Sequence, residues 1–305
     1  MRPSKYRLLR NFRSLSGQVL TGLAKIDHLT SNLDNNFQRE ALSNILNLKS
    51  NHLLFYLHFD KNDSVDQYDS YVINTLKDTF DNFYLVSNSK IDSNFIEEKT
   101  LLSQNKGRDL GAMRDIVNYL IEESYRGKIV FLNNSMYWGP QPQLVRFIRN
   151  MFNELKPGTL VGAVESFQIE RHFQSFALGL QFPDMVESWP SPLGHVRNWK
   201  LKRSLVRFGE IPICRFSESL GYRTHALVSR VNITSELHLQ IGPNASEIMN
   251  LQAKGIELNP TQHHWRLLRK LGIPGVKRSL VHANPAKLQD LEELPEILKD
   301  FLEPS

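Results

Sequence analysis

Residues 105–140 read NKGRDLGAMRDIVNYLIEESYRGKIVFLNNSMYWGP, and this stretch decides the fold. Two glycines bracket Arg108-Asp109 just before apolar positions that recur every three or four residues, which predicts a loop leading into a helix. A basic residue and a glycine at Arg126-Gly127 predict the end of that helix. A buried strand is expected over residues 128–132, and it stops at Asn133-Asn134-Ser135.

The same alternation of strands and helices surrounds this stretch. Apolar runs predict strands at 53–57, 83–86, 100–102 and 159–162, and three- to four-residue spacing predicts helices at 42–48 and 68–80 and a helix that begins at Pro140. Strand, helix and strand in succession predict a parallel pair with a right-handed crossover. The fold class expected is therefore a doubly wound α/β domain.

Polar residues follow each of the first four predicted strands. In an open α/β sheet, ligands bind at the carboxyl ends of the strands, so these residues are expected to line one cleft that holds a nucleotide. The residues concerned are His58, Asp60, Ser87, Asn88, Asn105, Gly107, Arg108, Asp109, Asn134 and Ser135.

Composition narrows the class of protein. The chain has 305 residues, of which 41% are apolar, enough for one large core. No apolar run approaches the roughly 20 residues that span a bilayer, and the N-terminus does not resemble a secretory signal. The single Cys214 cannot form an internal disulfide and is expected to be a buried thiol in a cytoplasmic protein.

The N-terminal segment carries most of the excess positive charge. Residues 1–26 have six basic side chains and no acidic one, and apolar residues recur there at helical spacing. A basic amphipathic helix of this kind either lies on an anionic membrane surface or packs on the domain or on a partner subunit. The rest of the chain is nearly neutral, which argues against nucleic acid as a partner.

Later segments add further motifs. They are HFQS at 172–175, a short helix expected between Glu210 and Gly221-Tyr222, and NPTQHHW with PGVKRSLVHANP between 259 and 285, expected as a helical hairpin. Together with NKGRDLG and FLNNSMYWGP, their order resembles the rhamnan synthesis protein F family, glycosyltransferases of cell-surface polysaccharide assembly. The resemblance covers residues 58–285.

The resemblance implies a GT-A-type fold and transfer of a sugar from a nucleotide-sugar donor, with dTDP-rhamnose as one candidate. The acceptor would be a cell-surface polysaccharide, lipopolysaccharide or lipid-linked glycan, met at the inner face of the membrane. With the basic N-terminal segment, we expect three parts: a basic helical segment at 1–48, the glycosyltransferase domain at 49–240 and a helical extension at 241–305.

In the GT-A pattern the strand-end residues contact the donor. Many GT-A enzymes hold a divalent metal on an Asp-any-Asp motif at the place of Asn133-Asn134-Ser135, where this chain has no carboxylate. Hard cations prefer carboxylate oxygens, so no metal ligand is assigned. Arg108, Lys277 or Arg278 would neutralise the diphosphate instead.

An inverting transfer needs a general base beside the acceptor hydroxyl. Glu210 is the first candidate because its spacing to Gly221-Tyr222 is similar to that of the catalytic acid in related enzymes, and His172 is the alternative. Gln174 and Trp265 are expected to contact the acceptor, although an aromatic residue in a helical hairpin is more often part of a core.

Two other classes of protein are alternatives to a glycosyltransferase. A nucleotide-sugar pyrophosphorylase would need a Gly-rich loop after the first strand, where this chain has His58-Phe59-Asp60. A non-catalytic module that keeps the GT-A fold and binds glycan or partner enzymes stays open because of the missing carboxylate pair.

Overall fold

The computed structural model describes residues 21–60, 65–88, 99–184, 189–239, 245–288 and 291–302. Most of the predicted basic N-terminal helix, residues 1–20, lies outside the described residues. Its end is helical over residues 21–30, and a segment of loop then leads to α2 (Arg39–Ile45).

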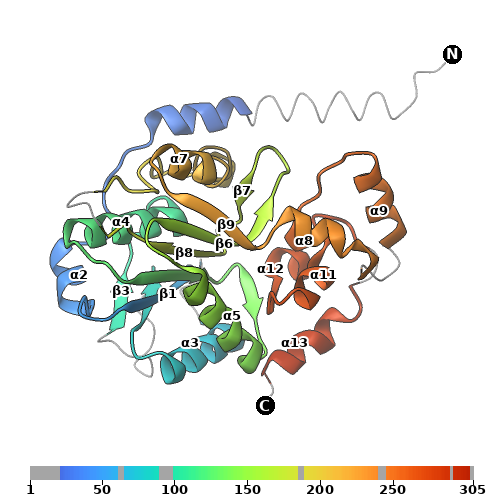
Figure 1. The fold of residues 1–305 in the computed structure, drawn as a ribbon, viewed down its shortest axis with the longest axis horizontal. Helices are drawn as coiled ribbons and strands as arrows, with labels where there is room; N and C mark the ends of the chain where they lie inside the picture. Colours follow the sequence, from blue (N-terminus) through green and yellow to red (C-terminus); the bar gives the residue numbers. More distant parts are fainter. Residues whose placement is uncertain are drawn as a thin grey trace.

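The described part of the chain forms a mixed α/β fold around an eight-stranded sheet, in the order β3-β2-β1-β4-β8-β6-β7 with β9 beside β6 (Figure 1). β1, β2, β3 and β4 are parallel neighbours, and β9 is parallel to β6. β8 runs antiparallel to both β4 and β6. The sheet is therefore mostly parallel and Rossmann-like, which confirms the α/β fold class. The strands are β1 (His52–His58), β2 (Phe83–Ser87), β3 (Thr100–Leu102), β4 (Lys128–Asn133), β6 (Thr159–Ser166), β7 (His172–Phe173), β8 (Ala177–Gln181) and β9 (Arg223–Val228).

Helices cover both faces of the sheet. One core joins α2, α4 (Arg108–Glu122) and α7 (Ile213–Ser219) to one face, and the second joins α3 (Gln67–Thr79), α5 (Gln141–Glu154) and α11 (Trp265–Lys270) to the other. β1 shows how the sequence builds this: Leu53, Phe55 and Leu57 enter the first core while Leu54 and Tyr56 enter the second. A strand buried on both faces reads as a continuous apolar run, as this one does.

The sequence predicted a helical hairpin for the C-terminal part, but this part also contains a strand. β10 (Gly275–Lys277) pairs antiparallel with β5 (Met136–Trp138), which directly follows the polar cluster after β4. This pairing brings Lys277 beside Met136 and so to the end of the central sheet. The remaining helices here are α8 (Arg230–Ser235), α9 (Ala245–Ala253), α10 (Pro260–His263), α12 (Arg278–His282) and α13 (Leu294–Leu302), with a short η3 (Leu237–Leu239).

One local prediction was wrong, and several strands were not predicted. α4 ends at Glu122 rather than at Arg126-Gly127, because the chain already turns at Ser124 with a left-handed φ of 54°. The apolar run 176–182 is the reversed strand β8, and β7 and β9 were missed altogether. The short helix predicted after Glu210 is confirmed as α7 (Ile213–Ser219), and Glu210 itself ends a π-helical turn, η2 (Leu205–Glu210), that continues α6 (Lys202–Ser204).

No helix within the described ranges combines the length and the apolar character that crossing a bilayer requires.

Candidate functional site

A cleft of about 860 Å³ lies at the carboxyl ends of the parallel strands, in the size range of small-molecule sites. Its walls come from the segments that follow β1, β2 and β4, from the loop before α4, from residues 198–210 and from the start of α12. Among the described residues, six basic and four acidic side chains line it. They are Lys106, Arg108, Lys200, Lys202, Lys277 and Arg278, with Asp34, Asp60, Asp109 and Glu210.

Two asparagines join the strand ends that form one wall of the cleft. The Asn88 amide donates to the backbone O of Asp60 (2.9 Å) and accepts from its N–H (3.1 Å). The Asn134 amide spans the backbone N–H and O of Phe59, both at 3.4 Å. These amides therefore fix the segment after β1 between the ends of β2 and β4, so their first role is to shape the wall.

The loop before α4 is built on a buried residue that the sequence did not single out. The Asn36 amide accepts from the backbone N–H of Lys106 (2.6 Å), donates to the backbone O of Lys106 (2.8 Å) and donates to Asp115 (2.9 Å). Gly107 has a left-handed φ of 68°, and a Cβ there would lie 2.9 Å from the backbone O of Arg197. A Cβ on Gly111 would lie 2.0 Å from the backbone O of Lys106, so both glycines are required by close approach.

Replacing Asn36 by alanine is expected to destabilise the fold by about 1–3 kcal/mol, because buried backbone groups of the loop lose their partners. Chemical denaturation of wild type and variant measures this difference. The exposed Asn35 is the matched control, and Asn35→Ala should change the free energy of unfolding by less than about 0.5 kcal/mol. Equal stability of Asn36→Ala and wild type would contradict the role assigned to this amide.

A chain of hydrogen bonds crosses the floor of the cleft. Asn133 donates to the Asp109 carboxylate (2.6 Å) and accepts from the Ser135 hydroxyl (2.5 Å). The Lys277 ammonium donates to the same hydroxyl at 3.0 Å. Asp109, at the N-terminal turn of α4, and Lys277, from the C-terminal part, are thus connected through the polar cluster after β4.

Glu210 lies at this floor. Its carboxylate accepts from the backbone N–H of Ser175 at 3.3 Å. Burial raises the pKa of the Glu210 carboxyl, opposed by the charges of Lys277 and His172, and the Asp109 carboxylate raises it further. A glutamate with a raised pKa at the end of a π-helical turn, a feature common at functional sites, suits a general base.

The charge of Lys277 acts on both acids. Burial lowers the pKa of the Lys277 ammonium, while the charges of Glu210 and Asp109 raise it and that of Lys202 lowers it further. Burial likewise raises the pKa of Asp109, opposed by its hydrogen bonds and by Lys277. One cation therefore interacts electrostatically with two carboxylates of the cleft, and the exposed Lys202 is close enough to affect its pKa.

Arg278 has a different place from the one predicted. Its guanidinium pairs with Asp66 and, at 2.8 Å, with the buried Asp69, and it lies 4.3 Å from the centre of the Tyr137 ring. Burial lowers the pKa of Arg278, and the hydrogen bond to Asp66 with the charge of Asp69 more than reverses that effect. With its charge matched by two carboxylates, Arg278 anchors the start of α12 and holds its neighbour Lys277 in place.

Several predicted site residues lie away from the cleft surface. His58 and Ser87 are fully buried beneath it, and His58 pairs with Asp69 at 3.3 Å. Trp265 is buried in a separate core with residues of α13 and does not line the cleft. Gln174 is buried and donates to Asn259 (3.0 Å), which leaves it outside the cleft lining.

His172 is also buried, on β7, and its Nδ1 lies 2.8 Å from the backbone O of Glu170. It influences Glu210 by charge but is not part of the cleft lining, so the geometry favours Glu210 as the base. The strand-end residues that do line the cleft are Asp60, Asn88, Asn105, Gly107, Arg108, Asp109, Asn134 and Ser135.

The donor set does not fit a tightly held divalent metal. Within the described part of the chain, no group of three or more His, Cys, Asp or Glu side chains is placed to hold one. The amides of Asn133 and Asn134 are engaged with protein groups, and the charge of Lys277 acts on both Asp109 and Glu210, the two carboxylates that a metal would need.

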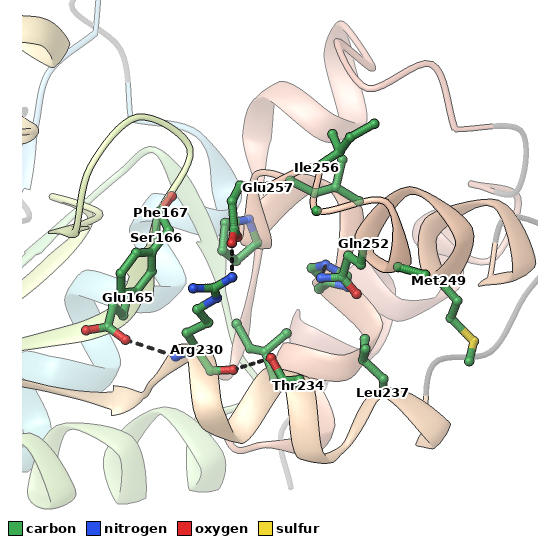
Figure 2. Close-up of a pocket in the computed structure, with 16 residues that line it drawn as sticks. Glu165, Ser166, Phe167, Arg230, Thr234, Leu237, Met249, Gln252, Ile256 and Glu257 are labelled. Carbon is green, nitrogen blue, oxygen red and sulfur yellow. Dashed lines mark hydrogen bonds and ion pairs between the residues drawn. The ribbon is translucent and has the colours of Figure 1, made fainter.

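A second pocket, of about 400 Å³, lies between the end of β6, α8 and α9 (Figure 2). The Arg230 guanidinium, which lines this pocket, is paired with Glu257. The Gln252 amide, also in the lining, lies 2.9 Å from the His264 ring. Burial lowers the pKa of His264 to about 4, so the ring is neutral at pH 7. The pocket has no unmatched cation among its described lining residues and is a poorer site for a diphosphate than the cleft.

Comparison of the sequence with protein-family models finds no match, and comparison with curated proteins finds none either.

Proposed function

We propose that the cleft binds a nucleoside diphosphate sugar and that the protein is a GT-A-type glycosyltransferase of cell-surface polysaccharide assembly, as the resemblance to the rhamnan synthesis protein F family implies. The observation that carries the proposal is the set of Asp109, Lys277 and Glu210 at the carboxyl ends of the parallel strands. A cation for the diphosphate and a glutamate for proton removal are the two groups that such a transfer requires.

In the proposed reaction Glu210 takes the proton from an acceptor hydroxyl. The hydroxyl oxygen then bonds to the anomeric carbon of the donor while the bond from that carbon to the diphosphate oxygen breaks. The electron pair of the broken bond leaves on the nucleoside diphosphate. Lys277, with Lys202 beside it, stabilises the charge that develops there, and Asp109 with Ser135 orients the ammonium.

Lys277 is proposed to do the work that a divalent metal does in many GT-A enzymes. Purified protein should therefore keep most of its transfer rate in excess chelator, because its fixed cation is not removed. The measurement is nucleoside diphosphate release with and without chelator, followed by metal addition. Complete loss that magnesium or manganese restores would contradict this role for Lys277.

Donor turnover separates the proposed enzyme from a non-catalytic binding module. The enzyme should hydrolyse its donor slowly in the absence of acceptor, releasing nucleoside diphosphate and free sugar. A panel of dTDP-, UDP- and GDP-sugars, with product detection by mass spectrometry, tests this. Saturable donor binding with no turnover, in the presence of chelator or of metal, would favour the binding module.

A further inference from the structure

Helix 21–30 packs on the protein through one face only (Figure 1). Ala24 is fully buried, and the Asp27 carboxylate accepts two backbone N–H groups just before α6, at 3.2 and 3.0 Å. The His28 ring stacks on Phe208 with 4.2 Å between centres and accepts from Trp199 at 3.2 Å. These contacts fix how the helix is rotated on the body, so its outer face is defined as well.

The outer face is apolar. Leu23 is 48% exposed, Ile26 59% and Leu29 79%, and they recur every three residues along the helix. Leu33, just beyond the helix, is 55% exposed as well. Single exposed apolar residues are ordinary, but three in one row on a helix whose other face is packed, with a fourth just beyond its end, mark an interaction surface. We call these four residues the leucine row.

Positive charge surrounds the leucine row. Lys25 on the helix and three basic residues on the adjoining segment, which are Lys200, Arg203 and Arg207, are exposed. The chain that leads into the helix adds Arg2, Lys5, Arg7, Arg10 and Arg13 with no acidic residue. A second copy of the same surface would meet this charge with its own, whereas an anionic surface would be attracted to it.

We propose that the leucine row docks the protein on an anionic lipid surface, with the apolar side chains in the headgroup boundary and the basic side chains against the lipid phosphates. This goes beyond the proposed sugar transfer. Trp199 and Lys200 each contact helix 21–30 and also line the cleft. Docking therefore places one edge of the cleft beside the bilayer, where an acceptor carried on a lipid would be within reach.

Co-sedimentation with phosphatidylcholine vesicles, with and without phosphatidylglycerol, tests the proposal on the full chain. Wild type should bind the vesicles that contain phosphatidylglycerol and be released by salt. The variant Leu23→Gln/Ile26→Gln/Leu29→Gln keeps every charge. Its affinity for the vesicles should be at least about 10-fold lower than that of wild type, because its apolar area is lost. The control, Ile169→Gln/Val231→Gln, removes two side chains that are 74% and 75% exposed elsewhere and should bind as wild type does.

Three results would overturn the proposal. Wild type would fail to bind anionic vesicles, or the triple variant would bind as well as wild type. Alternatively, the triple variant would lose thermal stability or change its oligomeric state, which would mean that this chain or a second copy covers the leucine row. Donor binding in solution should be the same for all three proteins, so failure here is distinguishable from failure of the proposed enzyme activity.

Discussion

Glu210→Gln should slow sugar transfer by about 10²-fold or more while leaving donor affinity nearly unchanged, since the amide has the same shape but cannot accept the acceptor proton. Single-turnover transfer rates and donor dissociation constants for wild type and variant measure the two effects separately. Glu154→Gln is the matched control, because Glu154 is half exposed and pairs with His225 far from the cleft lining.

Near wild-type transfer by Glu210→Gln would contradict the assignment of the base. If His172→Ala then abolished transfer, the base would be His172, and Glu210 would serve only to hold the backbone N–H of Ser175. The buried position of His172, with Nδ1 beside the Glu170 backbone, makes that outcome the less expected one.

Lys277→Met should weaken donor binding by about 10- to 100-fold, the scale of a lost hydrogen bond to a charged group. Methionine is similar in length to lysine but removes the cation whose charge acts on Asp109 and Glu210. Calorimetric titration with the nucleoside diphosphate measures the change. Lys254→Met, at an exposed position after α9, is the control and should bind as wild type does.

The same variant tests the coupling between Lys277 and Glu210. Transfer requires ionised Glu210, so activity should fall as pH drops through its pKa, which burial raises above the ordinary glutamate value. The charge of Lys277 lowers that pKa, so the acid limb of the pH profile should move to higher pH in Lys277→Met. An acid limb at the same pH in both proteins would show that the two groups do not interact.

Much of the fold followed from hydrophobic patterns. The runs that became β1, β2 and β4 are buried on both faces, so their sequence signal is strong. A hydrophobic pattern does not show whether a strand runs parallel or antiparallel to its neighbours. The apolar run 176–182 was visible, but its antiparallel place between β4 and β6 depends on tertiary pairing.

The site was predictable only in part. Ser135 stands just after β4 and Asp109 in the first turn of the helix that follows β3, and the sheet brings them together through Asn133. Asn36 gave no signal, because a single asparagine in a polar segment looks like any loop residue until its partner loop is placed against it. Lys277 and Arg278 are adjacent and equally basic, yet only the pairing of β10 with β5 decides which one faces the carboxylates of the cleft floor.

The most direct test of the central claim is calorimetric titration of dTDP-, UDP- and GDP-sugars into wild type, Asp109→Ala and Lys277→Met. At least one nucleotide sugar should bind wild type. The affinity of each variant for it should be at least about 10-fold lower, because each substitution removes part of the cleft floor. No binding by wild type, or equal affinities for all three proteins, would contradict a nucleotide-sugar site in this cleft.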